Sequence, residues 1–116
     1  MSPEGRKWRF RIAHILDSIE RIRSYTRGMS YEAFCDDPMV VDAVIRNFTI
    51  IGEAVAQIPG EVQSAHPAVP WTVMRGMRNV LVHEYDRVQT QVVWTTIQQD
   101  LPALVPLLQP ILEETA

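Results

Sequence analysis

Apolar residues recur at intervals of three and four along most of this chain, which is the pattern of helices that bury one face. The longest such series lies in the segment 38–58 and consists of Val41, Val44, Phe48, Ile51, Val55 and Ile58. A second series, in the segment 6–26, consists of Trp8, Ile12, Ile15, Ile19 and Ile22. No segment shows the strict alternation of a strand. The sequence therefore predicts an all-α protein, an antiparallel bundle of four to five helices.

Capping residues set the expected ends of the first two long helices. Gly28 follows the first helix in the position of a C-cap, and Ser30 can cap a brief turn after it. Asp37 is the expected N-cap of the second long helix, which carries Pro38 in its first turn and extends to about Ile58. These local signals divide the N-terminal half into two long helices and one short turn.

Glycine and proline also shape the middle of the chain. Gly52 lies inside the second long helix, where it costs about 1 kcal/mol relative to alanine, so we expect a close helix crossing there. Residues 61–69 are expected to form a connector that can include one short turn. Pro70 suits the first position of a third long helix, expected to extend to about Val82 or Glu84.

The C-terminal segment combines a helical pattern with regularly spaced prolines. Apolar residues keep the three-to-four spacing from about Thr90 onwards, but prolines occur at positions 102, 106 and 110. A proline inside a helix costs about 3 kcal/mol. We therefore expect a kinked terminal helix, with the kink or break near Asp100.

Composition limits the kinds of protein that the chain can be. Its 116 residues suit one domain, residues 1–116, and no apolar run approaches the roughly 20 residues that cross a bilayer. A single cysteine, Cys35, excludes an internal disulfide and fits a reducing cytoplasm, where we expect the protein to be. The three histidines are scattered in the sequence and form no recognisable zinc pattern, so no metal and no cofactor is expected.

The segment from Arg75 to Tyr85, RGMRNVLVHEY, does not fit a simple amphipathic helix. On a helix, Arg75, Asn79 and His83 form a polar line beside a broad apolar face. Arg78 lies on the edge of that apolar face. Because an unpaired buried charge is expensive, its guanidinium needs a partner or a ligand.

Arg78 and His83 together are sufficient for one metal-free reaction. An imidazole exchanges protons near neutral pH, and a guanidinium can hold a phosphate and stabilise its developing charge. The 2′-hydroxyl of RNA could then attack the neighbouring phosphate, with Asn79 and Tyr85 adding hydrogen bonds. On a continuous helix the two residues point roughly 140° apart and lie about 7.5 Å apart along the axis. One phosphate could reach both only if the helix ends early or a partner chain contributes, so we expect a cleft between the subunits of a homodimer.

Each of these residues also has a purely structural interpretation. His83 could satisfy the last carbonyls of a helix, Arg78 could form an interface ion pair, and Tyr85 could be a core aromatic. Arg75 and Asn79 could belong to a solvated helix face. The cations near the N-terminus (Arg6, Lys7, Arg9 and Arg11) are interpreted as a solvated face rather than an RNA contact, and His14 and His66 as residues without a function.

The chain resembles the HepT-like toxins of the HEPN superfamily. The resemblance rests on RNVLVHEY, from Arg78 to Tyr85, which fits that family's Arg-x4-His-x-Tyr pattern, on PW…RGM before it, and on IIGEA at residues 50–54. It implies a homodimer whose paired motifs form a metal-independent endoribonuclease site, with Arg78 and His83 as catalytic residues. Arg75, Asn79 and Tyr85 would support RNA binding.

The resemblance also implies a partner and a mode of control. HepT-like toxins occur with a minimal nucleotidyltransferase antitoxin, which can transfer AMP onto the motif tyrosine, here Tyr85. A bulky anion in a phosphate-binding cleft would exclude RNA by shape and charge. The net charge of −3 is unusual for an RNA-binding protein and suggests a small, local contact surface.

Two other functions remain compatible with the sequence. The same cleft could belong to a non-catalytic module that binds a nucleotide or recruits the nucleotidyltransferase. Alternatively, the protein could be a structural dimer in which Arg78 makes an interface ion pair. Substitution of His83 separates the nuclease from both alternatives, because only the nuclease needs the imidazole.

Overall fold

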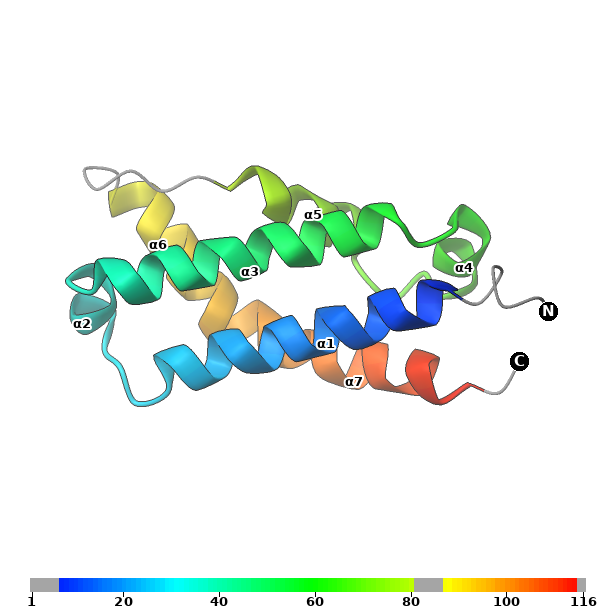
Figure 1. Ribbon diagram of the computed structural model, residues 1–116, viewed down its shortest axis with the longest axis horizontal. Coiled ribbons are helices and arrows are strands. Elements are labelled where there is room, and N and C mark those ends of the chain that lie inside the picture. The colour runs from blue at the N-terminus through cyan, green and yellow to red at the C-terminus, as the bar shows by residue number, and fades with distance from the viewer. Residues whose placement is uncertain (1–6, 81–86, 115–116) are drawn as a thin grey trace.

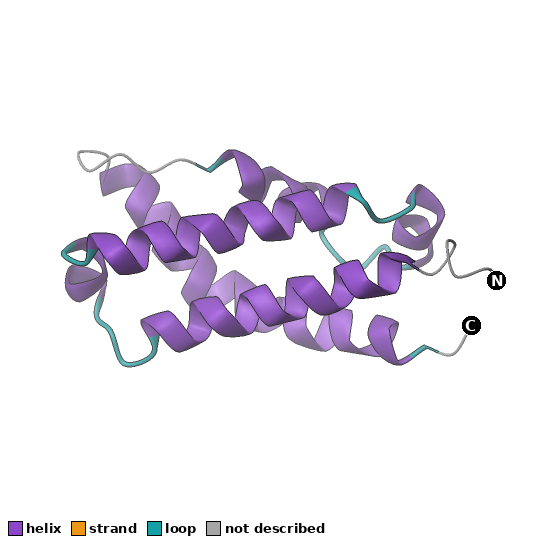
Figure 2. Cartoon of the chain, in the orientation of Figure 1, coloured by secondary structure: helices purple, strands orange, loops and turns teal. Residues whose placement is uncertain are grey.

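The protein is a bundle of helices, shown in Figures 1 and 2. The structure is a computed structural model and describes residues 7–80 and 87–114. Within these ranges there is no strand, so the all-α prediction is confirmed. The elements are α1 (Lys7–Thr26), α2 (Tyr31–Cys35), α3 (Pro38–Ala56), α4 (Gly60–Ala65), α5 (Trp71–Gly76), the 3-10 turn η2 (Met77–Asn79), α6 (Arg87–Thr95), the π-helical turn η3 (Thr96–Asp100) and α7 (Leu101–Glu113).

Two long antiparallel helices, α1 and α3, form the front of the bundle in Figure 1. Helix α7 packs against α1, and α5 with η2 packs against α3. Helix α2 connects α1 to α3 at one end of the bundle, and α4 lies at the other end, near the ends of α1 and α7. The short α5–η2 segment is therefore held mainly by α3.

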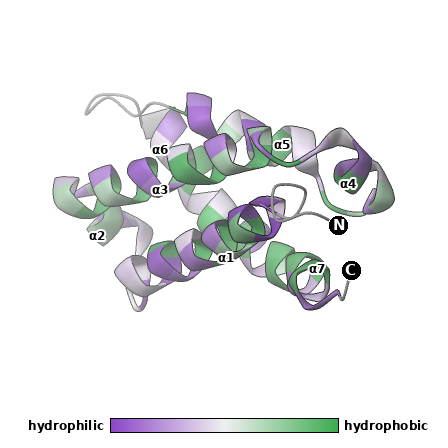
Figure 3. Cartoon of the chain, turned by 45° about the vertical axis from the view of Figure 1, so that its right-hand side comes forward, coloured by the Kyte–Doolittle hydropathy of each residue, from purple (hydrophilic) through white to green (hydrophobic). Residues whose placement is uncertain are grey.

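The core consists of the apolar faces that the periodicity predicted. The isoleucines of α1 and the seam of α3 are buried, and α7 adds its own inward residues, Leu101, Leu104, Leu108 and Ile111. Figure 3 shows hydrophilic and hydrophobic residues alternating along α1, whereas hydrophobic residues predominate on α7. Burial of these side chains contributes about 1.5–3 kcal/mol each. Among the described helices, none is both long and apolar enough to cross a membrane.

The predicted helix ends are confirmed in the N-terminal half. The Ser30 hydroxyl accepts a hydrogen bond from the Ala33 N–H at 3.1 Å, and the Asp37 carboxylate accepts one from the Val40 N–H at 3.2 Å. Gly28 has a φ of 78°, which favours glycine. Helix α3 ends two residues earlier than expected, at Ala56.

The kink predicted near Asp100 is present as the π-helical turn η3 between α6 and α7. A π turn widens the backbone just before Pro102, where a regular α-helix would press the proline ring against an earlier carbonyl. Pro106 and Pro110 then lie inside α7 without ending it. Both are exposed, so the carbonyls that they leave unpaired can lie on the solvent side of the helix.

The third long helix was predicted wrongly. Helix α5 ends at Gly76, η2 continues only to Asn79, and Val80 is extended, with φ −75° and ψ 121°. Gly76 lowers helix propensity, and the β-branched and apolar run that starts at Val80 is as compatible with extended backbone as with helix. Hydrophobic periodicity alone could not distinguish the two conformations.

Candidate functional site

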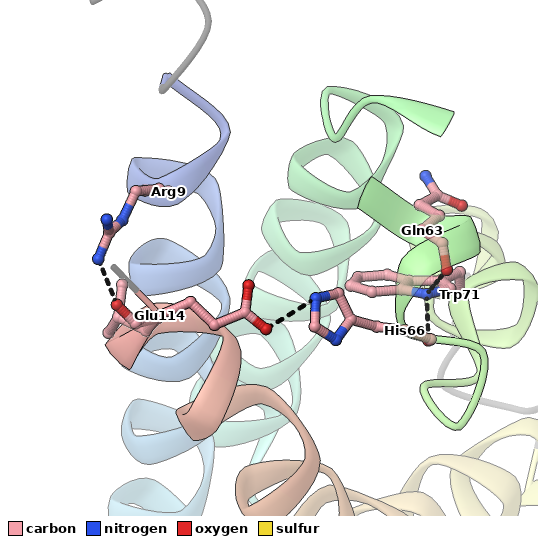
Figure 4. Close-up of polar contacts among 6 residues, drawn as sticks. Arg9, Gln63, His66, Trp71 and Glu114 are labelled. Atoms are coloured by element: carbon pink, nitrogen blue, oxygen red, sulfur yellow. Dashed lines mark hydrogen bonds and ion pairs between the residues drawn. The ribbon is translucent and has the colours of Figure 1, made fainter. Parts of the chain in front are cut away.

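The N-terminal end of α5 is fixed by hydrogen bonds to the connector before it. The Trp71 indole N–H donates to the carbonyl oxygens of Gln63, at 3.1 Å, and His66, at 3.0 Å. The Gln63 side chain in turn donates to the carbonyl oxygen of Ile58, at 3.1 Å, near the end of α3. Figure 4 shows the Trp71 ring lying against this connector. These bonds determine where α5 begins, and Trp71 itself is buried.

A second set of contacts connects this end of the molecule to its C-terminal helix. His66 Nε2 lies 3.1 Å from Glu114 Oε1, and Arg9 donates to the carbonyl oxygen of Leu112 (Figure 4). The connector, α1 and the end of α7 are thus joined by polar side chains. His66 therefore contributes to structure, a role that its position in the sequence did not reveal.

The C-terminal end of the α5–η2 segment crosses α3 at Gly52. A Cβ atom placed on Gly52 would lie 2.6 Å from Arg78 Cβ, 2.6 Å from Arg78 N and 2.8 Å from the Arg75 carbonyl oxygen. No side chain larger than hydrogen fits there without movement of the motif backbone. The close crossing expected at Gly52 is therefore confirmed, and its neighbour across the crossing is the motif arginine.

Arg78 has a partner within the chain, but a loose one. Its Nη1 lies 3.9 Å from Glu53 Oε2, beyond hydrogen-bonding distance. The Arg78 side chain is 33% exposed and the Glu53 side chain 62% exposed. An exposed pair of this kind contributes little to stability, about 0–1 kcal/mol. The guanidinium can therefore exchange the carboxylate for a phosphate at small cost.

The other expected site residues are only partly placed. Arg75, in the last turn of α5, and Asn79, at the end of η2, are both exposed. His83 and Tyr85 lie outside the described residues. The structure thus brings Arg75, Arg78 and Asn79 together on one short segment beside α3. Because the helical backbone ends at Asn79, the separation of Arg78 and His83 calculated for a continuous helix does not apply.

The described residues form no candidate metal-binding cluster near this segment. Within residues 7–80 and 87–114, no three side chains of His, Cys, Asp or Glu gather in a way that could hold a metal ion. What the described part of the site offers is cationic and neutral donors, namely Arg75, Arg78 and Asn79. Such donors suit a phosphate or another anion.

Comparison with known proteins identifies the family. The profile of the family described as Ribonuclease HepT-like matches residues 15–111 of this chain. The chain belongs to the HepT-like ribonuclease family. The matched range includes the whole of α3, the α5–η2 segment and the complete Arg-x4-His-x-Tyr motif.

The chain is similar over most of its length to several curated proteins. A protein of Caldanaerobacter subterraneus subsp. tengcongensis, whose name proposes an RNase, is 38% identical over 89% of this chain and 92% of its own length. A protein of Thermococcus cleftensis, whose name proposes ribonuclease HepT, is 41% identical over 78% of this chain and 82% of its own. A Methanocaldococcus jannaschii protein whose name also proposes an RNase is 32% identical over 86% of this chain and 83% of its own. No solved structure matches the chain significantly.

Two residues of this HepT-like site were missed by reasoning from the sequence. Glu53 was seen only as part of the IIGEA segment, and Gly52 only as the point of a helix crossing. The sequence did contain a signal, because a glycine that tolerates a close backbone approach is followed directly by a carboxylate. What it could not show is that the approaching backbone belongs to Arg78.

Proposed function

We propose that this HepT-like protein is a metal-independent endoribonuclease and the toxin of a toxin–antitoxin pair. The observation that carries the proposal is the state of Arg78. Its backbone is held against Gly52, while its guanidinium is partly exposed and only loosely paired with Glu53. A fixed backbone with a free cationic group is what a phosphate clamp requires. The family membership and the names of the relatives support RNA as the substrate.

In the proposed reaction the 2′-oxygen of a ribose attacks the adjacent phosphorus, and the bond to the 5′-oxygen of the next nucleotide breaks. His83 transfers the protons, from the 2′-hydroxyl and to the leaving oxygen. Arg78 neutralises the charge that builds up on the phosphoryl oxygens. Asn79, Arg75 and Tyr85 supply further hydrogen bonds to the RNA. The products are a 2′,3′-cyclic phosphate and a 5′-hydroxyl.

The proposed site lies in a cleft between two subunits. A two-fold dimer would place one copy of the Arg78–Tyr85 segment on each side of the bound RNA. The position of α5 and η2 against α3 is compatible with this arrangement, since Arg75 on α5 and Asn79 on η2 are exposed. The dimer follows from the family resemblance and is tested by the molecular mass of the protein in solution.

Control of the toxin is proposed to act on Tyr85. A minimal nucleotidyltransferase antitoxin would transfer AMP from ATP to the phenolic oxygen, with release of pyrophosphate. The added phosphate would occupy the position that Arg78 offers to RNA, so modification and substrate binding would exclude each other. Incubation of the toxin with the antitoxin and ATP should increase its mass by one AMP, and Tyr85→Phe should prevent this.

The decisive experiment compares the wild type with His83→Ala and Arg78→Ala. Each protein is induced in a host without the antitoxin, and each purified protein is incubated with RNA in the presence of a chelator. The wild type should arrest growth and cut RNA, and both variants should lose cleavage by at least about 100-fold. Arg23→Ala is the matched control for Arg78→Ala, because Arg23 is an exposed arginine on α1, away from the site. Equal cleavage by a folded His83→Ala protein, or none by the wild type, would refute the proposal.

A further inference from the structure

A groove lined by both polar and apolar side chains lies between α1 and α3. These are the two helices in the foreground of Figure 1. The groove consists of two adjoining cavities of about 350 and 460 Å³, which share His14 and Ile50 in their walls. The first cavity extends along α1 as far as Tyr25, and the second reaches Arg11 and Glu53. Cavities of this size accept groups as large as a nucleotide. We call these two cavities the α1–α3 groove.

The α1–α3 groove has a positive balance although the chain as a whole carries a net charge of −3. Its walls contain the arginines 11, 21 and 46 against the carboxylates of Asp17 and Glu53. Asp17 is paired with Arg21 at 2.9 Å, whereas Glu53 is paired only loosely with Arg78, at 3.9 Å. Asp17 and then Tyr25 raise the pKa of Arg21 above its usual value. Arg11 and Arg46 remain exposed, with no ion pair among the described residues.

One buried polar atom in the groove has no hydrogen-bond partner within the part of the chain that the structure describes. The Asn47 side chain lines the first cavity and is 5% exposed. Its Nδ2 donates to the Ala43 carbonyl oxygen at 2.9 Å, whereas its Oδ1 accepts no hydrogen bond from the described residues. A buried acceptor without a donor is unfavourable by about 1–3 kcal/mol. A ligand that brings an N–H group would relieve this cost. Each of the four RNA bases carries one: adenine and cytosine have an exocyclic amine, guanine has N1–H and an exocyclic amine, and uracil has N3–H.

Tyr25 adds an aromatic surface at the same cavity. Its side chain lines the cavity with Asn47 and Arg46, and the residue is 38% exposed. Aromatic rings next to arginines are the usual means by which proteins hold unpaired bases of single strands. The first cavity therefore combines a stacking surface, a hydrogen-bond acceptor and a phosphate-binding cation.

The groove is continuous with the motif arginine through one side chain. Glu53 lines the second cavity and is also the ion-pair partner of Arg78. A strand whose phosphate replaces Glu53 at Arg78 would therefore continue directly into the groove. Arg11 lines the same cavity as Glu53, and Arg46 lines the adjoining one.

We propose that the α1–α3 groove binds the single-stranded RNA segment that flanks the cleaved phosphate. Arg11 and Arg46 contact its phosphates, and Asn47 with Tyr25 holds one of its bases. This proposal rests on the proposed function and extends its binding site beyond the motif. It also supplies the small, local contact surface that the acidic composition requires, and it assigns Arg11 to RNA contact rather than to a solvated face.

The test measures RNA affinity in the absence of cleavage. Full-length His83→Ala protein is titrated into a fluorescently labelled single-stranded RNA, and anisotropy gives the Kd. When Arg46→Glu is added to the His83→Ala protein, the Kd should rise by about ten-fold or more. When Arg11→Glu and Arg46→Glu are both added, the Kd should rise further. Arg23→Glu is the matched control. It makes the same charge change at an exposed position of α1 that does not line the groove.

The control decides between a local contact and general electrostatics. A large loss of RNA affinity in Arg46→Glu, with less than about a two-fold change of the Kd in Arg23→Glu, supports RNA binding in the groove. Equal losses in both, or no loss in either, overturn it. Loss of the dimer in the Arg46→Glu protein also overturns it, because the groove would then be an interface between subunits.

A second variant tests the base pocket. Asn47→Leu keeps the branched shape and the number of heavy atoms of the side chain and removes its acceptor together with the donor to Ala43, so it should weaken RNA binding without lowering the melting temperature. A lower melting temperature with unchanged affinity would show that Asn47 has only a structural role. Cleavage assays separate this proposal from the nuclease itself: if the wild type cleaves and Arg46→Glu has an unchanged KM, the groove proposal fails while the proposed function stands.

Discussion

The two ends of the α5–η2 segment are held in opposite ways. At its beginning, Trp71 is buried and donates to two carbonyl oxygens, and the connector that accepts these bonds is itself bonded to α3 and α7. At its end, Arg78 is held by the contact of its backbone with Gly52 and by one ion pair of 3.9 Å. The Trp71 end is fixed by the hydrogen bonds and burial of a side chain, whereas the Arg78 end is fixed mainly by its backbone contact, with one loose ion pair.

This difference separates the end of the segment that supports the structure from the end that can bind a ligand. Hydrogen bonds and burial at Trp71 leave its side chain no alternative partner, so that end can only support the structure. At Arg78 the close crossing fixes the position of the backbone, while the guanidinium can bind either Glu53 or a phosphate. A side chain that must bind and release a phosphate needs this arrangement, because a strong internal ion pair would compete with the ligand.

The largest expected effect on stability comes from the Trp71 end of the α5–η2 segment. Trp71→Ala removes a buried indole and should lower the free energy of unfolding by about 3–5 kcal/mol. Trp71→Phe keeps most of the packing and loses only the N–H donor, so it should cost about 1–2 kcal/mol. Urea denaturation of the two variants measures both values. Similar losses for Ala and Phe would show that the hydrogen bonds, rather than the packing, hold the start of α5.

The next effect comes from the crossing itself. Gly52→Ala places a Cβ against the Arg78 backbone and should cost about 1–3 kcal/mol, with a loss of RNA cleavage because the motif must move. Gly76→Ala is the matched control, since a Cβ there meets nothing within 4 Å. It should be neutral or stabilise the protein by up to about 1 kcal/mol, because alanine favours the helix. Cleavage by Gly52→Ala at the wild-type rate would contradict the role of the crossing.

The features that could be predicted from the sequence are those set by nearby residues. Helical periodicity placed α1 and α3, and caps such as Ser30 and Asp37 depend on hydrogen bonds three residues along the chain. The kink near Asp100 followed from the proline spacing. The motif arginine could also be singled out, because a cation on an apolar edge is unusual whatever the fold.

The features that could not be predicted depend on contacts between distant segments. The pairing of Arg78 with Glu53 joins two helices, and the bonds of Trp71 depend on the path of the connector. The early end of the third helix was missed because an apolar run is compatible with helix and with extended backbone. Periodicity tells which face is buried, but it does not tell which residue lies opposite.

A smaller effect is expected where the connector meets the C-terminal helix. His66→Ala removes the contact with Glu114 and should lower the free energy of unfolding by at most about 1 kcal/mol, since Glu114 is half exposed. RNA cleavage should not change, because His66 contacts the start of α5 and not the motif. Chemical denaturation and a cleavage assay on the same preparation measure the two effects. A loss of cleavage without a loss of stability would show that this end of α5 also affects catalysis.

The smallest effect on stability, and the most informative one, is expected at Glu53. Glu53→Gln removes the charge that competes with phosphate for Arg78, so the free energy of unfolding should change by less than about 0.5 kcal/mol while RNA binds about two- to five-fold more tightly. Glu20→Gln is the matched control, because Glu20 forms a similar exposed pair with Arg27, at 3.5 Å, outside the α1–α3 groove. If both variants tighten binding equally, the gain comes from net charge. If Glu53→Gln instead weakens RNA binding, the carboxylate orients Arg78 for the phosphate. The Arg78 end of the α5–η2 segment is then held more firmly than its 3.9 Å ion pair indicates.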